Sequence, residues 1–237
     1  MSIERENMAE HIVRLQDVVK TYQQGKVAVH AVNGVSLDIK NGDFAALCGP
    51  SGSGKTSLLN LIGGLDVPSS GQVWVDGINL ASLSKTELSA VRKNRIGFVF
   101  QSYNLIPVMT AYENAEFVLN LQGVSETECR DRVMQTLQAV GLEGLEGRRP
   151  DEMSGGQQQR VAIARAIVTE PAIVLADEPT ANVDSHTAES LLDLMQQLNQ
   201  EQGITFLFST HDQHVMDRAR RIIQVHDGKI ESDEVQN

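Results

Sequence analysis

The pattern of hydrophobic positions changes several times along the chain. Residues 11–40 alternate apolar and polar positions, and the turn pair Asn41-Gly42 separates them from the apolar run 44–47. This pattern predicts a series of strands. A second hairpin is predicted over 71–78, because Asp76-Gly77 supplies the positive φ angles that a type I′ turn needs. The first hundred residues therefore indicate a β-rich, partly antiparallel layer.

The apolar spacing becomes helical from about residue 105 to residue 147. Val133, Leu137 and Val140 recur at intervals of three or four residues, and Gly141 follows them as a stop signal. We interpret residues 105–157 as an inserted helical subdomain, which carries no internal repeat that would suggest a solenoid.

Strands and helices alternate in the last third of the chain. Such alternation predicts a mainly parallel sheet with right-handed crossovers. The expected helices cover 155–169, 185–200 and a stretch from Asp212, and the expected strands cover 172–176, 204–209 and 221–225. We expect the acidic tail 231–237 to be solvated and loose.

Composition narrows the class of protein. The 237 residues, 41% of them hydrophobic, suffice for one core, whereas 20 Lys and Arg against 31 Asp and Glu give a net charge of −11. This charge disfavours non-specific nucleic-acid binding. Cys48 and Cys129 lack metal-ligand spacing, and no run approaches the roughly 18 apolar residues of a membrane span. We therefore expect a cytoplasmic protein with no direct membrane insertion. Residues 1–10 are expected to form an N-terminal tail.

A glycine-rich loop carries the clearest chemistry. Residues 49–56 fit G-x-x-x-x-G-K-[ST] and lie between an apolar strand and an apolar-periodic helix, which disfavours a simple glycine turn. Backbone N–H groups of such a loop converge on phosphates, Lys55 reaches the terminal phosphate oxygens, and the Thr56 hydroxyl can bind Mg²⁺. The predicted ATP-binding residues here are Gly49, Pro50, Ser51, Gly52, Ser53, Gly54, Lys55, Thr56 and Ser57.

Two adjacent carboxylates follow the expected strand 172–176. The carboxyl ends of parallel strands form the ligand-binding edge of such a sheet, so Asp177 is suited to Mg²⁺ and Glu178 to orienting a water molecule. Alone, an Asp-Glu pair indicates a solvated loop. Together with the glycine loop, the pair predicts a phosphoryl-transfer site.

A second glycine-bearing segment opens the helix 155–169. Ser154 and Gln157 stand at capping-box spacing around Gly155 and Gly156, so an ordinary capped helix is the alternative. Nevertheless, Met153–Arg160 resembles the LSGGQ signature of the ATP-binding-cassette (ABC) ATPases. The other motifs of that family stand in order along essentially the whole chain, as Tyr22, the glycine loop, Gln101, Asp177-Glu178, the segment 181–184 and His211.

The resemblance implies a fold, a cofactor and a dimer. The expected fold is an α/β P-loop cassette with a mainly parallel core sheet, an antiparallel β layer and the helical insert. The nucleotide-binding domain would be single and cover 11–237, with 11–100 and 158–230 as its core. In this family two cassettes bind ATP and Mg²⁺ head to tail, so that Ser154, Gly155, Gly156 and Gln157 of one copy complete the site of the other. A helix N-terminus suits that role.

Individual roles also come from the resemblance. Tyr22 would stack on adenine, Gln101 would sense Mg²⁺ and water, and His211 would contact the γ-phosphate, while Asp184 would link the two sites of the dimer. Catalysis would involve Glu178, His211 and Gln101, and metal binding Thr56, Gln101 and Asp177. Two segments depart from the usual family motifs without removing a phosphate ligand: Met153 replaces the usual Leu, and Ala181-Asn-Val-Asp184 replaces the commoner form that contains Gly and Leu.

Within the family, the segments 60–66, 97–107 and 149–157 look most similar to the lipoprotein-releasing and macrolide-exporter ATPases. That resemblance implies a homodimer attached to an integral membrane permease of these systems, on the cytoplasmic face of the bacterial inner membrane. The partner would dock around 103–113, where 105–109 are apolar, although this run could equally be subdomain core.

Other functions of the same family fit less well or need another partner. A soluble ABC ATPase acting as an assembly or scaffold factor is the alternative to a transport or mechanotransmission subunit. A DNA-repair or translation factor fits poorly with a single acidic cassette, and an importer subunit with a regulatory domain fits poorly with the 26 residues that follow His211.

Overall fold

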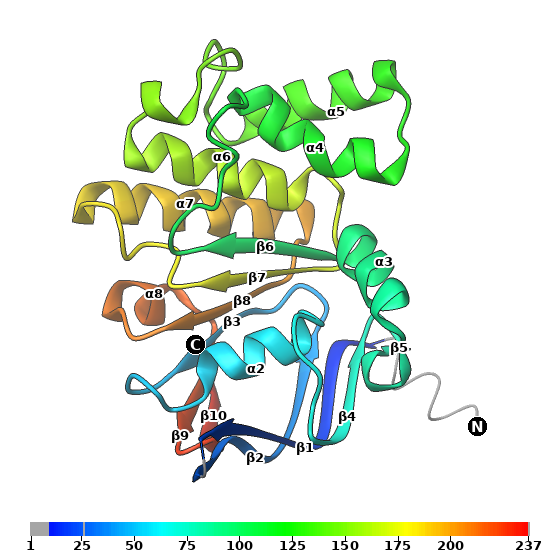
Figure 1. Cartoon of the computed structure of the whole chain (residues 1–237). Helices are drawn as coiled ribbons and strands as arrows, with labels where there is room; N and C mark the ends of the chain where they lie inside the picture. The colour runs from blue at the N-terminus through cyan, green and yellow to red at the C-terminus, as the bar shows by residue number, and fades with distance from the viewer. Residues whose placement is uncertain (1–9, 26, 237) are drawn as a thin grey trace.

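The computed structural model describes residues 10–25 and 27–236, so the expected tail 1–10 lies almost wholly outside the described residues. Two sheets organise the described chain (Figure 1). The larger sheet has the strand order β10-β9-β3-β8-β7-β6, and the smaller has the order β2-β1-β4-β5. The strands of the larger sheet are β3 (Phe44–Cys48), β6 (Ile96–Phe100), β7 (Ile173–Asp177), β8 (Phe206–Thr210), β9 (Arg221–His226) and β10 (Lys229–Val235).

The larger sheet is mainly parallel, as predicted. Strands β9, β3, β8, β7 and β6 pair in parallel, and β10 pairs antiparallel with β9. The connecting helices are α2 (Lys55–Ile62), α6 (Gly155–Ile167), α7 (Ser185–Gln202) and α8 (Gln213–Arg218). Parallel pairing requires such crossover connections, and it leaves the carboxyl ends of these strands at one edge.

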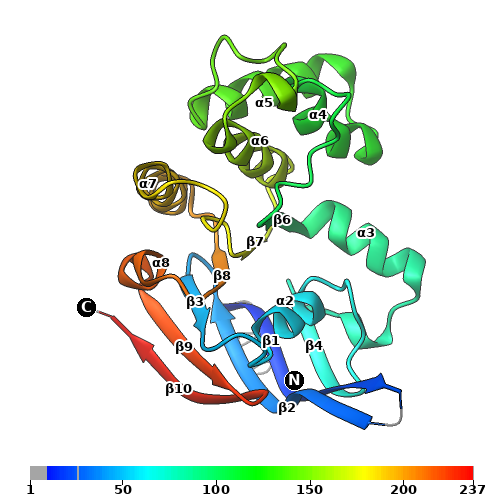
Figure 2. The ribbon, with the colours of Figure 1, turned by 60° about the vertical axis from the view of Figure 1, so that its left-hand side comes forward.

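Side chains of β3 alternate between two hydrophobic clusters on opposite faces of this sheet. Phe44, Ala46 and Cys48 belong to the cluster that includes α6 and α7, and Ala45 and Leu47 belong to the cluster that includes α2 and the smaller sheet. All five are fully buried or nearly so. Helix α2 therefore lies between the two sheets (Figure 2), which fixes the position of the glycine loop in front of it.

The smaller sheet is antiparallel, as predicted. It contains β1 (His11–Gln24), β2 (Val27–Lys40), β4 (Ser70–Val75) and β5 (Ile78–Asn79). Asp76 and Gly77 have φ angles of 50° and 73°, which confirms the tight turn between β4 and β5. The short helix η1 (Leu80–Ser82) then leads to α3 (Lys85–Arg95), a helix that the sequence pattern did not predict, although Ser84 and Glu87 form a capping box at its start.

The helices α4 (Ala111–Gln122) and α5 (Glu126–Ala139) lie with α6 beyond strand β6 (Figure 1). Val133, Leu137 and Val140 are fully buried, and Gly141 has a φ of 72°, so the helical spacing and the stop are both confirmed. The short helix η2 (Pro150–Glu152) precedes α6.

The expectation of a loose acidic tail is wrong for residues 231–235. They belong to β10, where Arg221 of β9 donates two hydrogen bonds to the Asp233 carboxylate at 2.7 Å and a third to Asp43 at 3.0 Å. These charge-assisted bonds offset the low strand propensity of the acidic residues. Among the described residues, no helix combines the length and the hydrophobicity required to traverse a bilayer.

Candidate functional site

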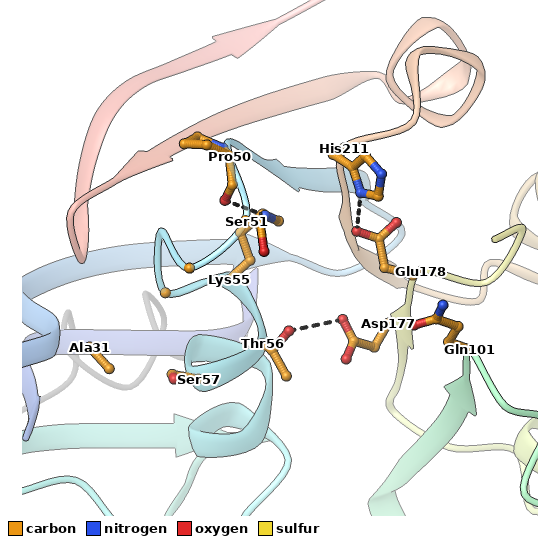
Figure 3. Close-up of a pocket in the computed structure, with 12 residues that line it drawn as sticks. Ala31, Pro50, Ser51, Lys55, Thr56, Ser57, Gln101, Asp177, Glu178 and His211 are labelled. Carbon is orange, nitrogen blue, oxygen red and sulfur yellow. Dashed lines mark hydrogen bonds and ion pairs between the residues drawn. The ribbon is translucent and has the colours of Figure 1, made fainter. Parts of the chain in front are cut away.

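A cavity of about 530 Å³ lies at the edge where β3, β6, β7 and β8 end (Figure 3). It brings together the glycine loop and the residues that follow three other strands, which are far apart in the sequence. Its lining residues are Ala31, Pro50, Ser51, Gly52, Gly54, Lys55, Thr56, Ser57, Gln101, Asp177, Glu178 and His211. Eleven of these twelve residues, all except Ala31, belong to the motifs that the sequence indicated, and the cavity therefore unites the predicted phosphate, metal and catalytic groups.

The backbone of the loop requires glycine at two positions. Gly49 and Gly54 have φ angles of 147° and 109°. A Cβ atom on Gly49 would lie 2.1 Å from the carbonyl oxygen of Val225, and one on Gly54 would lie 2.3 Å from that of Ala31. Gly54 precedes the first turn of α2, whose free N–H groups point toward anions. The loop can thus wrap a phosphate group closely.

Lys55 folds back over the loop. Its side chain donates hydrogen bonds to the carbonyl oxygens of Gly49 and Pro50 at 2.8 and 2.9 Å, and the residue is 6% exposed. Because carbonyl oxygens are neutral acceptors, a phosphate oxygen is a stronger partner for this ammonium group. The positively charged side chain of Lys55 therefore lies at the cavity, where it can bind a phosphate oxygen.

Oxygen donors for a divalent cation face each other across the cavity. The Thr56 hydroxyl donates to Asp177 Oδ1 at 3.2 Å, and Gln101 lies beside Asp177 (Figure 3). The described residues contain no group of three or more His, Cys, Asp or Glu side chains that could hold a metal alone. Hydroxyl, amide and carboxylate oxygens fit Mg²⁺, which binds one or two carboxylates and completes its shell with water and substrate phosphates.

Glu178 is held by its backbone and by two side chains. It has a φ of 46°, a left-handed conformation, and its N–H donates to the carbonyl of Ser209 at 2.9 Å. His211 Nδ1 lies 2.6 Å from Glu178 Oε1, and the Thr210 hydroxyl donates to Oε2 at 3.2 Å. The carboxylate therefore has a fixed orientation beside the loop.

The predicted signature segment lies elsewhere on the chain's surface. Ser154 accepts from the Gln157 N–H at 3.3 Å, and the Gln157 side chain accepts from the Ser154 N–H at 2.9 Å, which confirms the capping box. A Cβ atom on Gly156 would lie 2.4 Å from Thr187 Cγ2. None of the described residues that line the cavity comes from 154–157. One copy of the chain does not bring the two motifs together.

Asp184 caps α7 and does not line the cavity. It accepts from the N–H and the hydroxyl of Thr187 at 3.0 and 2.6 Å. These two bonds lower the pKa of the Asp184 carboxyl, the bond from the Thr187 hydroxyl being the larger cause. The carboxylate therefore stays ionised at neutral pH at the start of this helix.

Tyr22 also lies outside the residues that line the cavity. Its hydroxyl donates to Asp66 Oδ2 at 2.8 Å, and the Lys20 ammonium lies 4.9 Å from the ring centre. Burial, together with the Asp66 carboxylate, raises the pKa of Tyr22. Burial alone would raise the pKa of Asp66, but bonds from Lys20 and Tyr22 lower it below its usual value. The ring is thus anchored at its hydroxyl end.

An apolar groove of about 370 Å³ lies between β6, α3, α4 and α6. Phe98, Phe100, Phe117 and Leu121 contribute to its apolar lining, and Asn104 also lines it. The segment 105–109 that we expected to form the apolar surface lines no part of this groove. Within the segment 105–109, Val108 is 74% exposed, whereas Leu105 packs against the core.

Sequence reasoning missed several residues that organise the site. Thr210 binds Glu178, Asn182 binds the carbonyl of Gln101, and Arg165 binds the carbonyls of Tyr103 and Asn104. Thr210 could have been found, because it lies between the predicted strand 204–209 and His211. No local signal distinguishes Arg165 from other arginines on helices.

Comparison with known proteins decides the family. Residues 32–181 match the sequence profile described as ABC transporter, which is more than half of the chain. The chain belongs to the ABC transporter family. It is also 44% identical over 227 residues to the ABC transporter ATP-binding protein MJ0796 of Methanocaldococcus jannaschii, a match that covers 94% of this chain and 97% of that protein.

Macrolide exporters are similar over one part of their length. The ABC cassette described here is 46% identical over 222 residues to the macrolide export ATP-binding/permease protein MacB of Syntrophobacter fumaroxidans, covering 93% of this chain and 31% of that protein. The chain thus spans about a third of the length of this relative.

Solved structures of MJ0796 share the fold of this ABC cassette. A dimer bound to ADP and phosphate superimposes with a TM-score of 0.87 at 44% identity, covering 95% of this chain and 99% of that chain. A second dimeric structure of the same protein matches equally well. The predicted α/β cassette fold is confirmed, and the chain is an ATPase subunit of the ABC transporter type.

Proposed function

We propose that this cassette binds Mg-ATP, dimerises head to tail and hydrolyses ATP to drive a separate membrane partner of the lipoprotein-release or efflux type. The observation that carries the proposal is the single cavity that gathers the glycine loop, Asp177, Glu178 and His211, with the signature segment 154–157 outside it. A second copy supplies the missing segment.

Nucleotide binding uses the loop and Tyr22. The backbone N–H groups of 49–57 and the start of α2 hold the phosphates, and Lys55 exchanges its carbonyl partners for phosphate oxygens. Tyr22 stacks on the adenine ring. Thr56, Gln101 and Asp177 hold Mg²⁺, which, when bound, neutralises negative charge on the phosphates.

Hydrolysis depends on Glu178. Its carboxylate, held by Thr210 and His211, orients a water molecule whose oxygen attacks the γ-phosphorus. The bond from that phosphorus to the β–γ bridging oxygen breaks, the water proton passes toward the carboxylate, and ADP and phosphate leave. His211 contacts the γ-phosphate, and Gln101 positions the water from the end of the neighbouring strand β6.

Dimerisation completes each site. In the second copy the N-terminus of α6, with Ser154, Gly155, Gly156 and Gln157, faces the γ-phosphate as an anion receptor. Asp184 lies in the loop that links the two sites. The dimeric structures of MJ0796, 44% identical to this chain, support this arrangement.

The apolar groove beside Asn104 is the proposed docking site of the membrane partner. An apolar helical segment fits it, as helices fit grooves in other complexes. Arg92 and Lys93 line the groove, and each donates a hydrogen bond to a backbone carbonyl, that of Gly64 and that of Leu121. Because carbonyls leave the two positive charges unneutralised, acidic residues on the partner would be favoured. The permease part of the macrolide-export relatives supports such a partner.

The proposal places the chain on the cytoplasmic face of the bacterial inner membrane, as a peripheral subunit formed by one nucleotide-binding domain over 11–237. Residues 11–100 and 158–230 form its core, and about 105–157 its helical subdomain. The net charge of −11 argues against a nucleic-acid partner.

The Glu178→Gln variant tests the hydrolytic role. It should bind Mg-ATP, lose turnover by at least a hundredfold and sediment as a dimer with Mg-ATP but not with ADP. Glu201→Gln, which removes a carboxylate from the last turn of α7, is the matched control and should retain turnover. Unchanged turnover in Glu178→Gln would overturn the role of this residue.

Co-purification of Glu178→Gln with Mg-ATP in mild detergent tests the partner. A multi-span membrane protein in the eluate supports transport or mechanotransmission. Recovery of soluble partners alone would contradict it and favour the assembly or scaffold function that the sequence left open.

A further inference from the structure

Three segments that the sequence separates meet at Tyr103. They are the loop after β6, the loop 178–184 after β7, and the N-terminal end of α6. The contacts among them join the apolar groove to the nucleotide cavity, because Asn104 lines the groove and Gln101 lines the cavity.

The loop after β6 has an unusual backbone that Arg165 holds in place. Tyr103 and Asn104 have φ angles of 57° and 51°, and two consecutive left-handed residues without glycine are costly. Arg165 of α6 donates to the carbonyl of Asn104 at 2.5 Å and to that of Tyr103 at 2.9 Å. Burial lowers the pKa of this guanidinium, which nonetheless stays charged. Its forked donors match two adjacent carbonyls, a geometry that a lysine cannot reproduce.

Tyr103 and Asn182 then close the junction. The Tyr103 hydroxyl donates to the carbonyl of Asn182 at 3.0 Å, and the Asn182 side chain donates to the carbonyl of Gln101 at 2.8 Å. The two loops are thus bonded in both directions, so a displacement of one loop moves the other.

The first signature glycine packs against this junction. A Cβ atom on Gly155 would lie 2.8 Å from the Tyr103 hydroxyl and 3.6 Å from the Asn182 carbonyl. Capping alone does not require glycine at this position. The N-terminus of α6 therefore has its place fixed by Tyr103 as well as by its own cap.

We infer that Tyr103, Asn182 and Arg165 are positioning residues that hold the signature end of α6 and the loop 178–184 in the arrangement that a second copy binds. The inference rests on the proposed function, since it assumes an ATP-dependent dimer. The apolar groove is connected to the same junction, because Arg165 and Asn104 both line the groove. Arg165 donates to the carbonyl of Tyr103, and Asn104 is the next residue in the chain.

A loosened junction would have to be ordered again on dimerisation, which weakens association and leaves the nucleotide contacts of the single chain intact. We expect Tyr103→Phe, in the Glu178→Gln background with saturating Mg-ATP, to raise the dimer dissociation constant at least tenfold. The ATP affinity of the monomer should change by less than twofold. Sedimentation velocity gives the dimer dissociation constant. Titration with a fluorescent ATP analogue, at protein concentrations well below that constant, gives the ATP affinity of the monomer.

Tyr112→Phe is the matched control, because it removes a hydroxyl from α4 without touching the junction, and it should dimerise as the parent does. Asn182→Ala should weaken the dimer as Tyr103→Phe does. Arg165→Lys should weaken it too, since one ammonium replaces two forked donors.

The outcomes are distinguishable. If Glu178→Gln itself fails to dimerise, the proposed function fails. If it dimerises and Tyr103→Phe and Asn182→Ala dimerise equally well, the junction does not position the interface. A lower melting temperature with an unchanged dimer dissociation constant would likewise overturn the inference, because it would show a role in folding stability alone.

Discussion

His211 Nδ1 lies 2.6 Å from Glu178 Oε1, although the two residues follow different strands and stand 33 positions apart. The Glu178 side chain is 17% exposed and that of His211 is 72% exposed. An ionised carboxylate only accepts hydrogen bonds, so the ring nitrogen at this distance donates. The other ring nitrogen can donate to a phosphate oxygen only when it also carries a proton, so it is the imidazolium form of His211 that can bind Glu178 and a phosphate at once.

The His211→Ala variant tests this pairing. We expect kcat for ATP hydrolysis to fall about a hundredfold, because the carboxylate loses its orienting partner and the γ-phosphate loses a contact. The affinity for ADP should stay within about twofold, since ADP has no γ-phosphate. A coupled phosphate-release assay and ADP titration measure the two quantities. His214→Ala, an exposed histidine on α8, is the control, and equal kcat in both variants would contradict the pairing.

The sequence predicted the site better than the surroundings that hold it in place. The glycine loop, Asp177-Glu178 and Ser154–Gln157 are local patterns, and each lies where its pattern places it relative to a strand or helix. The strand β10 was not predictable, because Arg221 stabilises it through Asp233 and Asp43 from distant positions. The bond from Thr210 to Glu178 likewise depends on strands that meet only in the fold.

The Tyr22 side chain has two roles, one for its ring and one for its hydroxyl, and two substitutions can separate them. Its ring is proposed to stack on adenine, and its hydroxyl binds Asp66. Tyr22→Phe keeps the ring and should bind ATP within about threefold of the parent. Tyr22→Ala should bind about tenfold more weakly, the effect of losing one aromatic stacking contact. Calorimetric titration with a non-hydrolysable ATP analogue checks both values, and equal affinity of Tyr22→Ala and the parent would contradict the stacking.

Both thiols should be unreactive in the native protein. Burial raises the pKa of Cys48 to about 11, with Glu178 adding to the rise and Lys55 opposing it. Burial and the Glu116 carboxylate also raise the pKa of Cys129. At pH 8 roughly one Cys48 thiol in a thousand is ionised, and the thiolate is the reactive form.

Titration with a thiol reagent at pH 8 checks this expectation. No thiol should react within minutes in the native state, and both should react in denaturant. Because the pKa lies above the assay pH, raising the pH should speed labelling of Cys48. Rapid labelling of Cys48 at pH 8 in the folded protein would show that the end of β3 is accessible and contradict the burial.

Asn114 is the buried polar residue that shapes the loop between the nucleotide cavity and α4. It is fully buried, and its side chain bonds to the N–H of Ile106 and to the carbonyls of Ile106, Met109 and Thr110 at 2.8–3.2 Å. Four backbone groups of one turn-rich segment thus depend on one amide. The same segment contains Val108, which is 74% exposed.

Replacing Asn114 with Ala should lower the free energy of unfolding by about 3 kcal/mol, because buried backbone groups lose their partner. Urea denaturation measures the change. Asn120→Ala, in the same helix at an exposed position, should change stability by less than about 0.5 kcal/mol. The segment 105–110 should also be cleaved faster by protease in Asn114→Ala. A stability equal to that of the Asn120 control would show that solvent replaces the amide, which the full burial of Asn114 argues against.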